Sequence, residues 1–287
     1  MQTIPVIYFS ASNNTKYLAE LIAHGIRSQH LTAHLISLTE ADTYKHDIHH
    51  ASILCIGAPI YGGDYAPPMQ TWIENTDFTG KTVYLFSTAA ILFFGSFHRA
   101  KKLIEERNGT VLGGFEMKFT AAGDGFFYTK RFSERFPLTK KDILTAYSYG
   151  QQIASSFQQN TTTFLDYTKK HHLPDLTTFV VKHLLKDPLV FLFVHFFPRY
   201  DKKQCTVCKK CETICPTHAI SITNSMKRPI NPNHCIMCFQ CAKHCSTNAL
   251  YLTKNKKFIY YEGPWQLKGY ILPEEIIHYT KQKNSEK

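Results

Sequence analysis

The chain has 287 residues, of which 44% are hydrophobic and 14% aromatic, a composition that predicts about two globular domains and excludes a largely disordered protein. Its formal net charge of +11 is uneven, because residues 199–287 hold 15 Lys and Arg against 6 Asp and Glu. These basic residues do not form a nucleic-acid motif. We therefore expect the positive charge to suit an acidic redox partner or an anionic membrane surface, and no nucleic acid.

The first 158 residues alternate between two kinds of pattern. Apolar runs at 4–9, 32–38, 52–57, 82–88 and 111–119 predict strands, and helical spacing at 17–26, 68–76, 97–107 and 139–158 predicts helices between them. This alternation favours an α/β fold with a doubly wound, parallel, five-stranded sheet. Ligands of such sheets bind at the carboxyl ends of strands where the strand order reverses, so loops 10–15, 58–68 and 88–97 should meet there.

The loop after the first strand is rich in small polar side chains and immediately precedes a helix. Amides and the dipole at a helix N-terminus favour a phosphate group. The loop has neither a Walker lysine nor a G-x-G-x-x-G sequence, which excludes the common nucleotide fingerprints. The alternative is a helix cap without a ligand. The candidate phosphate-binding residues are Ser10, Ser12, Asn13, Asn14 and Thr15.

The next two loops combine glycine with aromatic residues, a composition that suits a planar aromatic ligand. The candidate ring-binding residues are Pro59, Tyr61, Gly62, Tyr65 and Phe94. Alternatively, the two tyrosines only pack the second loop onto the surface. Cys55 lies inside an apolar strand and is expected to be an inert core residue.

Residues 159–198 form a connector that begins with polar residues and ends in an apolar run. That run, 188–198, is too short to span a bilayer. We expect helices that dock the two parts of the chain. The alternative is a membrane-surface contact through 176–203, assisted by Arg199, Lys202 and Lys203.

Eight of the nine cysteines form two arrays with the same spacing, C-x-x-C-x-x-C-x-x-x-C. That spacing is typical of bacterial ferredoxins with two 4Fe-4S clusters. The sequence around the arrays also repeats, which predicts two pseudo-symmetric units. Disulfides are typical of short secreted chains, and zinc sites use paired cysteines separated by a longer loop, so neither explains the pattern well. The arrays are Cys205, Cys208, Cys211 and Cys215, then Cys235, Cys238, Cys241 and Cys245.

The match to the ferredoxin motif implies a crossed ligand assignment, in which the fourth cysteine of each array binds the cluster of the other array. One cluster would be held by Cys205, Cys208, Cys211 and Cys245, and the other by Cys235, Cys238, Cys241 and Cys215. Pro216 follows Cys215, as the motif expects, whereas Ser246 follows Cys245.

Residues 1–158 resemble a flavodoxin-type FMN domain, and residues 199–256 resemble a two-cluster bacterial ferredoxin. The whole chain is similar to the flavodoxin–ferredoxin fusion proteins called EFR-family ferrodoxins. The resemblance implies four parts: an FMN domain at 1–158, the connector at 159–198, the ferredoxin domain at 199–256 and a C-terminal extension at 257–287. Ser10, Ser12, Asn14 and Thr15 match the family's phosphate binders, while Ala11 and Asn13 replace glycines.

The resemblance implies a cytoplasmic iron–sulfur flavoprotein that carries electrons between 4Fe-4S clusters and FMN. It would convert between one-electron and two-electron protein partners, and no catalytic residue is expected. Two alternatives remain open. One is a flavin-dependent reductase of a quinone, a flavin or a ferric chelate, and the other is a ferredoxin whose docking domain lacks flavin.

Overall fold

The computed structural model describes residues 3–61, 64–89, 97–119, 137–167, 199–223, 229–231, 234–251 and 262–276. These residues divide into two compact units. The first unit contains the described residues up to 119 together with 137–167 and 263–276, and the second contains 199–251 and Glu262. The chain therefore leaves the first unit, forms the second and then returns to the first.

The first unit contains a parallel sheet with the strand order β2-β1-β3-β5-β6-β7. The predicted fold class is confirmed, and each of the five predicted strands is present. The sheet is larger than predicted, because the three-residue β7 adds a sixth parallel strand and the two-residue β4 pairs antiparallel with β3. The strands are β1 (Thr3–Tyr8), β2 (Thr32–Ser37), β3 (Ile53–Tyr61), β4 (Asp64–Tyr65), β5 (Thr82–Ala89), β6 (Thr110–Lys118) and β7 (Leu165–Tyr167).

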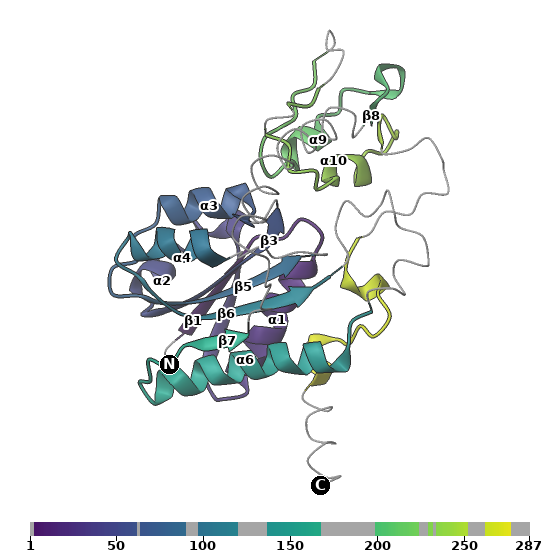
Figure 1. Cartoon of the computed structure of the whole chain (residues 1–287). Helices are drawn as coiled ribbons and strands as arrows, with labels where there is room; N and C mark the ends of the chain where they lie inside the picture. The colour runs from purple at the N-terminus through teal and green to yellow at the C-terminus, as the bar shows by residue number, and fades with distance from the viewer. Residues whose placement is uncertain are drawn as a thin grey trace, which may run out of the picture. The chain divides into compact units, whose positions relative to one another are not determined.

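Helices cover both faces of this sheet, with α1 and α6 on one face and α2, α3 and α4 on the other (Figure 1). The buried side of α1 follows from its sequence, since Leu18, Leu21 and Ile22 recur at helical spacing and are fully buried. The five helices are α1 (Asn14–Arg27), α2 (Lys45–His50), α3 (Pro67–Glu74), α4 (Phe97–Glu105) and α6 (Lys140–Gln158).

Two glycines allow α1 and α6 to pack closely. A Cβ atom built at Gly25 would lie 2.1 Å from the carbonyl oxygen of Tyr147, and one built at Gly150 would lie 2.1 Å from that of Ile22. Both distances are far below van der Waals contact. The helix backbones can therefore touch only because both positions lack a side chain.

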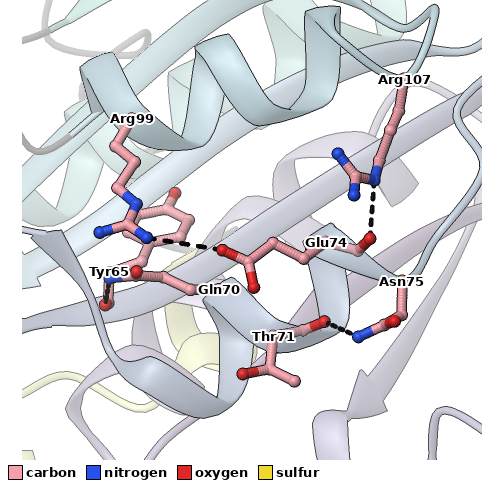
Figure 2. Close-up of polar contacts among 7 residues, drawn as sticks. All are labelled: Tyr65, Gln70, Thr71, Glu74, Asn75, Arg99 and Arg107. Carbon is pink, nitrogen blue, oxygen red and sulfur yellow. Dashed lines mark hydrogen bonds and ion pairs between the residues drawn. The ribbon is translucent and has the colours of Figure 1, made fainter.

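Polar contacts around the C-terminal end of α3 connect it to neighbouring segments (Figure 2). The Nε atom of Arg107 donates to the carbonyl oxygen of Glu74 at 2.7 Å, and Arg99 forms an ion pair with the Glu74 side chain at 3.5 Å. At the other end of α3, the Gln70 amide donates to the carbonyl oxygen of Tyr65. These contacts join α3 to α4, to the residues just after α4 and to β4, which pairs with the end of β3.

Residues 263–276, here called the C-terminal segment, pack on the first turn of α1 and on Leu138, two residues before α6. The Tyr17 hydroxyl donates to the carbonyl oxygen of Ile271 at 2.7 Å, and the rings of Tyr17 and Tyr270 are 5.0 Å apart. The Leu138 amide donates to the carbonyl oxygen of Lys268 at 3.0 Å. The segment contains the short 3-10 helices η5 (Pro264–Gln266) and η6 (Pro273–Glu275). It is therefore an integral part of the first unit.

The second unit consists of two similar halves and a small antiparallel sheet. Left-handed backbone conformations at Val207, Lys209 and His218 recur 30 positions later at Met237, Phe239 and Asn248. This recurrence confirms the predicted repeat. The elements are β8 (Arg199–Tyr200), η4 (Lys202–Gln204), α9 (Lys210–Thr213), α10 (Gln240–Lys243) and β9 (Leu250–Tyr251).

Within the described ranges, the structure contains no helix with the length and apolar character needed to cross a membrane. Within the predicted connector, residues 165–167 form β7 in the sheet of the first unit instead of a helix. Residues 168–198 lie outside the described ranges, so the predicted helices there and most of the possible membrane contact through 176–203 stay predictions.

Candidate functional site

The eight arrayed cysteines line two separate cavities in the second unit. Each cavity takes three cysteines from one array and the fourth from the other. The first is lined by Cys205, Cys208, Cys211 and Cys245. The second is lined by Cys235, Cys238, Cys241 and Cys215. The structure thus brings together each predicted ligand set, while ligation itself stays a prediction.

The loops between the cysteines curve sharply because alternate residues adopt left-handed backbone conformations. In the first array these residues are Val207, with a φ angle of 57°, and Lys209, with 58°. Such a conformation is unfavourable for a β-branched side chain and costs on the order of 1–3 kcal/mol. A bound group that holds the loop by three thiolates would offset that cost.

Backbone amides point at the fourth sulfur of each array in the same way. The Ala219 amide donates to the Sγ atom of Cys215 at 3.2 Å, and the Ala249 amide donates to the Sγ atom of Cys245 at 3.2 Å. The hydroxyls of Thr217 and Thr247 lie 3.7 Å from the same two sulfurs. Amide donors of this kind stabilise the negative charge of a thiolate.

The thiols differ in how easily they ionise as free groups. Burial raises the pKa of Cys211 and of Cys238 to about 11, and it raises the pKa of Cys241 well above its usual value. At Cys245 burial acts in the same direction, but hydrogen bonds from Leu250, Thr247 and Ala249 outweigh it and lower the pKa. A metal ion deprotonates a coordinating thiol outright. The positive charge of bound iron would therefore stabilise these buried thiolates.

The donor sets fit 4Fe-4S clusters better than disulfides or zinc ions. All nine cysteines are free thiols, which argues against a disulfide framework. Zinc sites use paired cysteines separated by a longer loop, whereas each set here takes three closely spaced cysteines and one distant cysteine. Among the described residues, no group of three His, Cys, Asp or Glu side chains converges on a single-ion site.

The predicted phosphate loop lies at the carboxyl end of β1 and the N-terminus of α1. Asn13 adopts a left-handed conformation with a φ angle of 61°, as expected for a residue that replaces glycine. The Thr15 and Thr88 hydroxyl oxygens are 2.8 Å apart, which joins this loop to the end of β5. The Ser10 hydroxyl oxygen is buried and has no hydrogen-bond partner in the described part of the chain. An orphaned donor at a helix N-terminus fits a phosphate oxygen.

The predicted ring-binding residues are not all available for that role. Pro59 and Tyr61 lie partly exposed at the carboxyl end of β3. Tyr65 has only 1% of its surface exposed, and its hydroxyl donates to the carbonyl oxygens of Ile56 and Phe86. Its ring therefore belongs to the protein core instead of flanking a flavin. Gly62 and Phe94 lie outside the described residues.

Cys55 is fully buried in β3, and burial raises the pKa of its thiol. The prediction of an inert core residue is confirmed. Sequence reasoning missed Tyr200, which lines the first cavity and whose hydroxyl forms a hydrogen bond with Cys205. It also missed Thr217 and Thr247, although their equal distance from the last cysteine of each array was a usable signal.

Comparisons with known proteins assign a domain to each part. Residues 5–96 match the model of a flavodoxin domain, and residues 197–246 match that of a 4Fe-4S dicluster domain. No curated protein matches the chain. The chain thus contains the domains of an iron–sulfur flavin electron carrier. More particularly, it joins a flavodoxin domain to a 4Fe-4S dicluster domain, as a flavodoxin–ferredoxin fusion does.

Solved structures similar to this chain are flavodoxins and flavodiiron proteins. An archaeal flavodoxin is 20% identical with a TM-score of 0.44, over 55% of this chain and 99% of its own. The flavodiiron core of a Synechocystis protein is 18% identical with a TM-score of 0.44, over 55% of this chain and 36% of its own. A flavodoxin from Bacillus cereus is 16% identical with a TM-score of 0.40, over 54% of this chain and 98% of its own.

Proposed function

We propose that this protein carries electrons through two 4Fe-4S clusters and one FMN, and that it connects one-electron with two-electron redox partners. Clusters exchange single electrons, whereas a flavin accepts one or two. The observation that carries the proposal is the pair of four-cysteine cavities in a chain that also contains a flavodoxin domain. A reducing compartment such as the cytoplasm suits thiolate-held clusters.

The chain's own residues would hold these groups in three places. The two cavities would each hold one cluster by the crossed cysteine sets. At the N-terminus of α1, the hydroxyl of Ser10 and the amides of the loop that ends at Thr15 would bind the phosphate. Pro59 and Tyr61, partly exposed at the end of β3, are the described residues placed to contact the ring.

An anaerobic cofactor inventory tests the proposal. Iron, acid-labile sulfide and extracted flavin are measured per chain, with visible absorbance before and after dithionite. We expect about eight irons and one FMN. About eight irons without a flavin that can be rebound would leave a two-cluster ferredoxin with a flavin-free docking domain. Absence of iron after anaerobic reconstitution would overturn the proposal.

Pairs of cysteine substitutions test the crossed assignment. Cys215→Ala with Cys238→Ala removes two ligands of one predicted cluster, so about four irons should remain. Cys215→Ala with Cys208→Ala removes a ligand from each predicted cluster, so both clusters should be lost. An uncrossed arrangement gives the opposite result for the two pairs. Cys55→Ala is the control, and its iron content should equal that of the parent protein.

A further inference from the structure

We propose that the surface around the first cavity is the docking site for an acidic redox protein, which passes electrons to the cluster held there. This inference rests on the proposed function. It starts from a difference between the two pseudo-symmetric halves. Cys208 is exposed, whereas Cys238, at the equivalent position 30 residues later, is buried with 8% of its surface exposed. A protein partner can therefore approach a ligand of the first cluster more closely than the equivalent ligand of the second.

The first half is also more positively charged than the second half at the equivalent cavity-lining positions. Lys209 and Lys210 are exposed and line the first cavity. The equivalent residues Phe239 and Gln240 line the second cavity, and neither carries a charge. Phe239 is also buried, with 2% of its surface exposed. The repeat preserves the backbone at this position, since Lys209 and Phe239 are both left-handed, while the side chain changes from charged to apolar.

Two further lysines extend the positive surface. Lys202 and Lys203 are exposed in η4, immediately before Cys205. Two carboxylates lie in this region: Asp201 accepts a hydrogen bond from the Lys203 amide at 3.0 Å, and Glu212 accepts one from the Ile222 amide. In the ranges that the structure covers, no ion pair involves any of the four lysines. All four lysines are exposed, whereas Asp201 and Glu212 are only partly exposed, so the groups that a partner meets at this surface are mainly positive.

A positive surface next to an exposed ligand favours association with an acidic protein. Long-range attraction raises the rate of encounter and orients the partner, and its effect falls as the ionic strength rises. Each transfer removes one electron from the reduced partner and adds one electron to the cluster of the first cavity. No bond is made or broken and no proton is needed, so the partner is the only co-reactant.

A plant-type 2Fe-2S ferredoxin with an acidic surface is a suitable probe, with the full-length, cluster-loaded protein. Carbodiimide joins lysines to carboxylates in contact, and mass spectrometry then identifies the joined residues. We expect links at Lys202, Lys203, Lys209 or Lys210. Stopped-flow mixing with the reduced probe should show that Lys209→Glu with Lys210→Glu lowers the second-order rate at low salt at least about tenfold and weakens its salt dependence.

Lys140→Glu with Lys141→Glu is the matched control, because it makes the same change in net charge on exposed residues at the start of α6. Its rate should change by less than about twofold. Equal effects of the two variants, or links confined to the first unit, would overturn the docking site. Iron content and reduction by dithionite are measured in the same samples. If the clusters are loaded but the rates do not depend on these lysines, this inference alone is refuted. If the clusters are missing, the proposed function is refuted.

Discussion

The hydroxyl of Ser10 offers a direct test of flavin binding at the scale of one residue. It is buried without a partner in the described structure, so Ser10→Ala should leave the stability of the flavin-free protein almost unchanged. A hydrogen bond to a charged phosphate contributes about 1.5–3 kcal/mol, so the variant should bind FMN about 10–100-fold more weakly. Quenching of flavin fluorescence measures the affinity.

Ser37→Ala, at the carboxyl end of the neighbouring β2, is the control for Ser10→Ala and should bind FMN as the parent protein does. Equal affinities of the Ser10→Ala variant and the parent would contradict a phosphate contact at Ser10.

Glu20 on α1 should make the stability of the first unit depend on pH. Burial raises the pKa of its carboxyl, the nearby Lys16 opposes this change and Glu274 of the C-terminal segment adds to it. Because the folded-state pKa lies above the unfolded-state value, the native state holds the proton more tightly. The stabilisation that comes from this tighter proton binding is complete below the unfolded-state pKa of about 4.3, and it is lost as the pH rises through the folded-state pKa.

Glu20→Gln removes this dependence, so the variant should melt at a higher temperature than the parent at pH 7, and the difference should vanish near pH 4. Differential scanning calorimetry at both pH values measures it. Glu106→Gln is the matched control, because Glu106 also forms an i,i+4 ion pair with a lysine but lies exposed. The prediction would be contradicted if the melting temperatures of the parent protein and of the Glu20→Gln variant changed with pH in the same way.

Single residues differed in how well the sequence predicted them. The cysteine sets could be predicted because the spacing within each array is local, and a short loop presents its thiolates on one side. Tyr65 could not, since its position depends on carbonyl groups of β3 and β5 that lie 9 and 21 positions away. A glycine-rich loop with two tyrosines gives no indication of which ring turns inward.

At the scale of elements, the contact between α1 and α6 should not tolerate a side chain at Gly150. An exposed Gly→Ala change within a helix stabilises it by up to about 1 kcal/mol, but here the Cβ atom would meet the backbone of α1. We expect Gly150→Ala to lower the free energy of unfolding by about 1–3 kcal/mol, as overpacking in a core does. Urea denaturation followed by circular dichroism measures it.

Ser148→Ala, on the same helix, is the control, because it changes helix propensity without adding an atom at the contact. It should leave the unfolding midpoint unchanged or raise it slightly. A Gly150→Ala variant as stable as this control would show that the two helices can separate without cost.

The long elements were predicted well because each repeats a clear pattern over many residues. The six-residue α2, the two-residue β4 and the three-residue β7 were missed, since so few positions cannot establish a period. The packing of the C-terminal segment was also missed. Its contacts with Tyr17 and Leu138 join residues more than 100 positions apart, and no local pattern reports such a contact.

At the scale of the whole molecule, removal of iron should affect the two units differently. The second unit has left-handed residues and buried thiols that a cluster would stabilise, whereas the first unit has an extensive apolar core. We expect a chelator to increase amide hydrogen exchange throughout 199–251 while 3–119 stays protected. Hydrogen exchange with mass spectrometry measures both regions in one sample.

The control for iron removal is the same chelator already saturated with iron, which should change neither unit. Unchanged protection of 199–251 after complete loss of iron would show that this unit folds without its clusters.

The return of the chain to the first unit makes the second unit an insertion, connected at both ends. In the proposed function, electron exchange between the units would be intramolecular, with an effective concentration set by the chain segments that join them instead of by the amount of protein present. Its rate should not change on dilution. Proteolytic cleavage of the connector alone would not release the second unit, because the C-terminal segment would still anchor it through Tyr17 and Leu138. The C-terminal segment thus provides a second, non-covalent attachment of the second unit to the first.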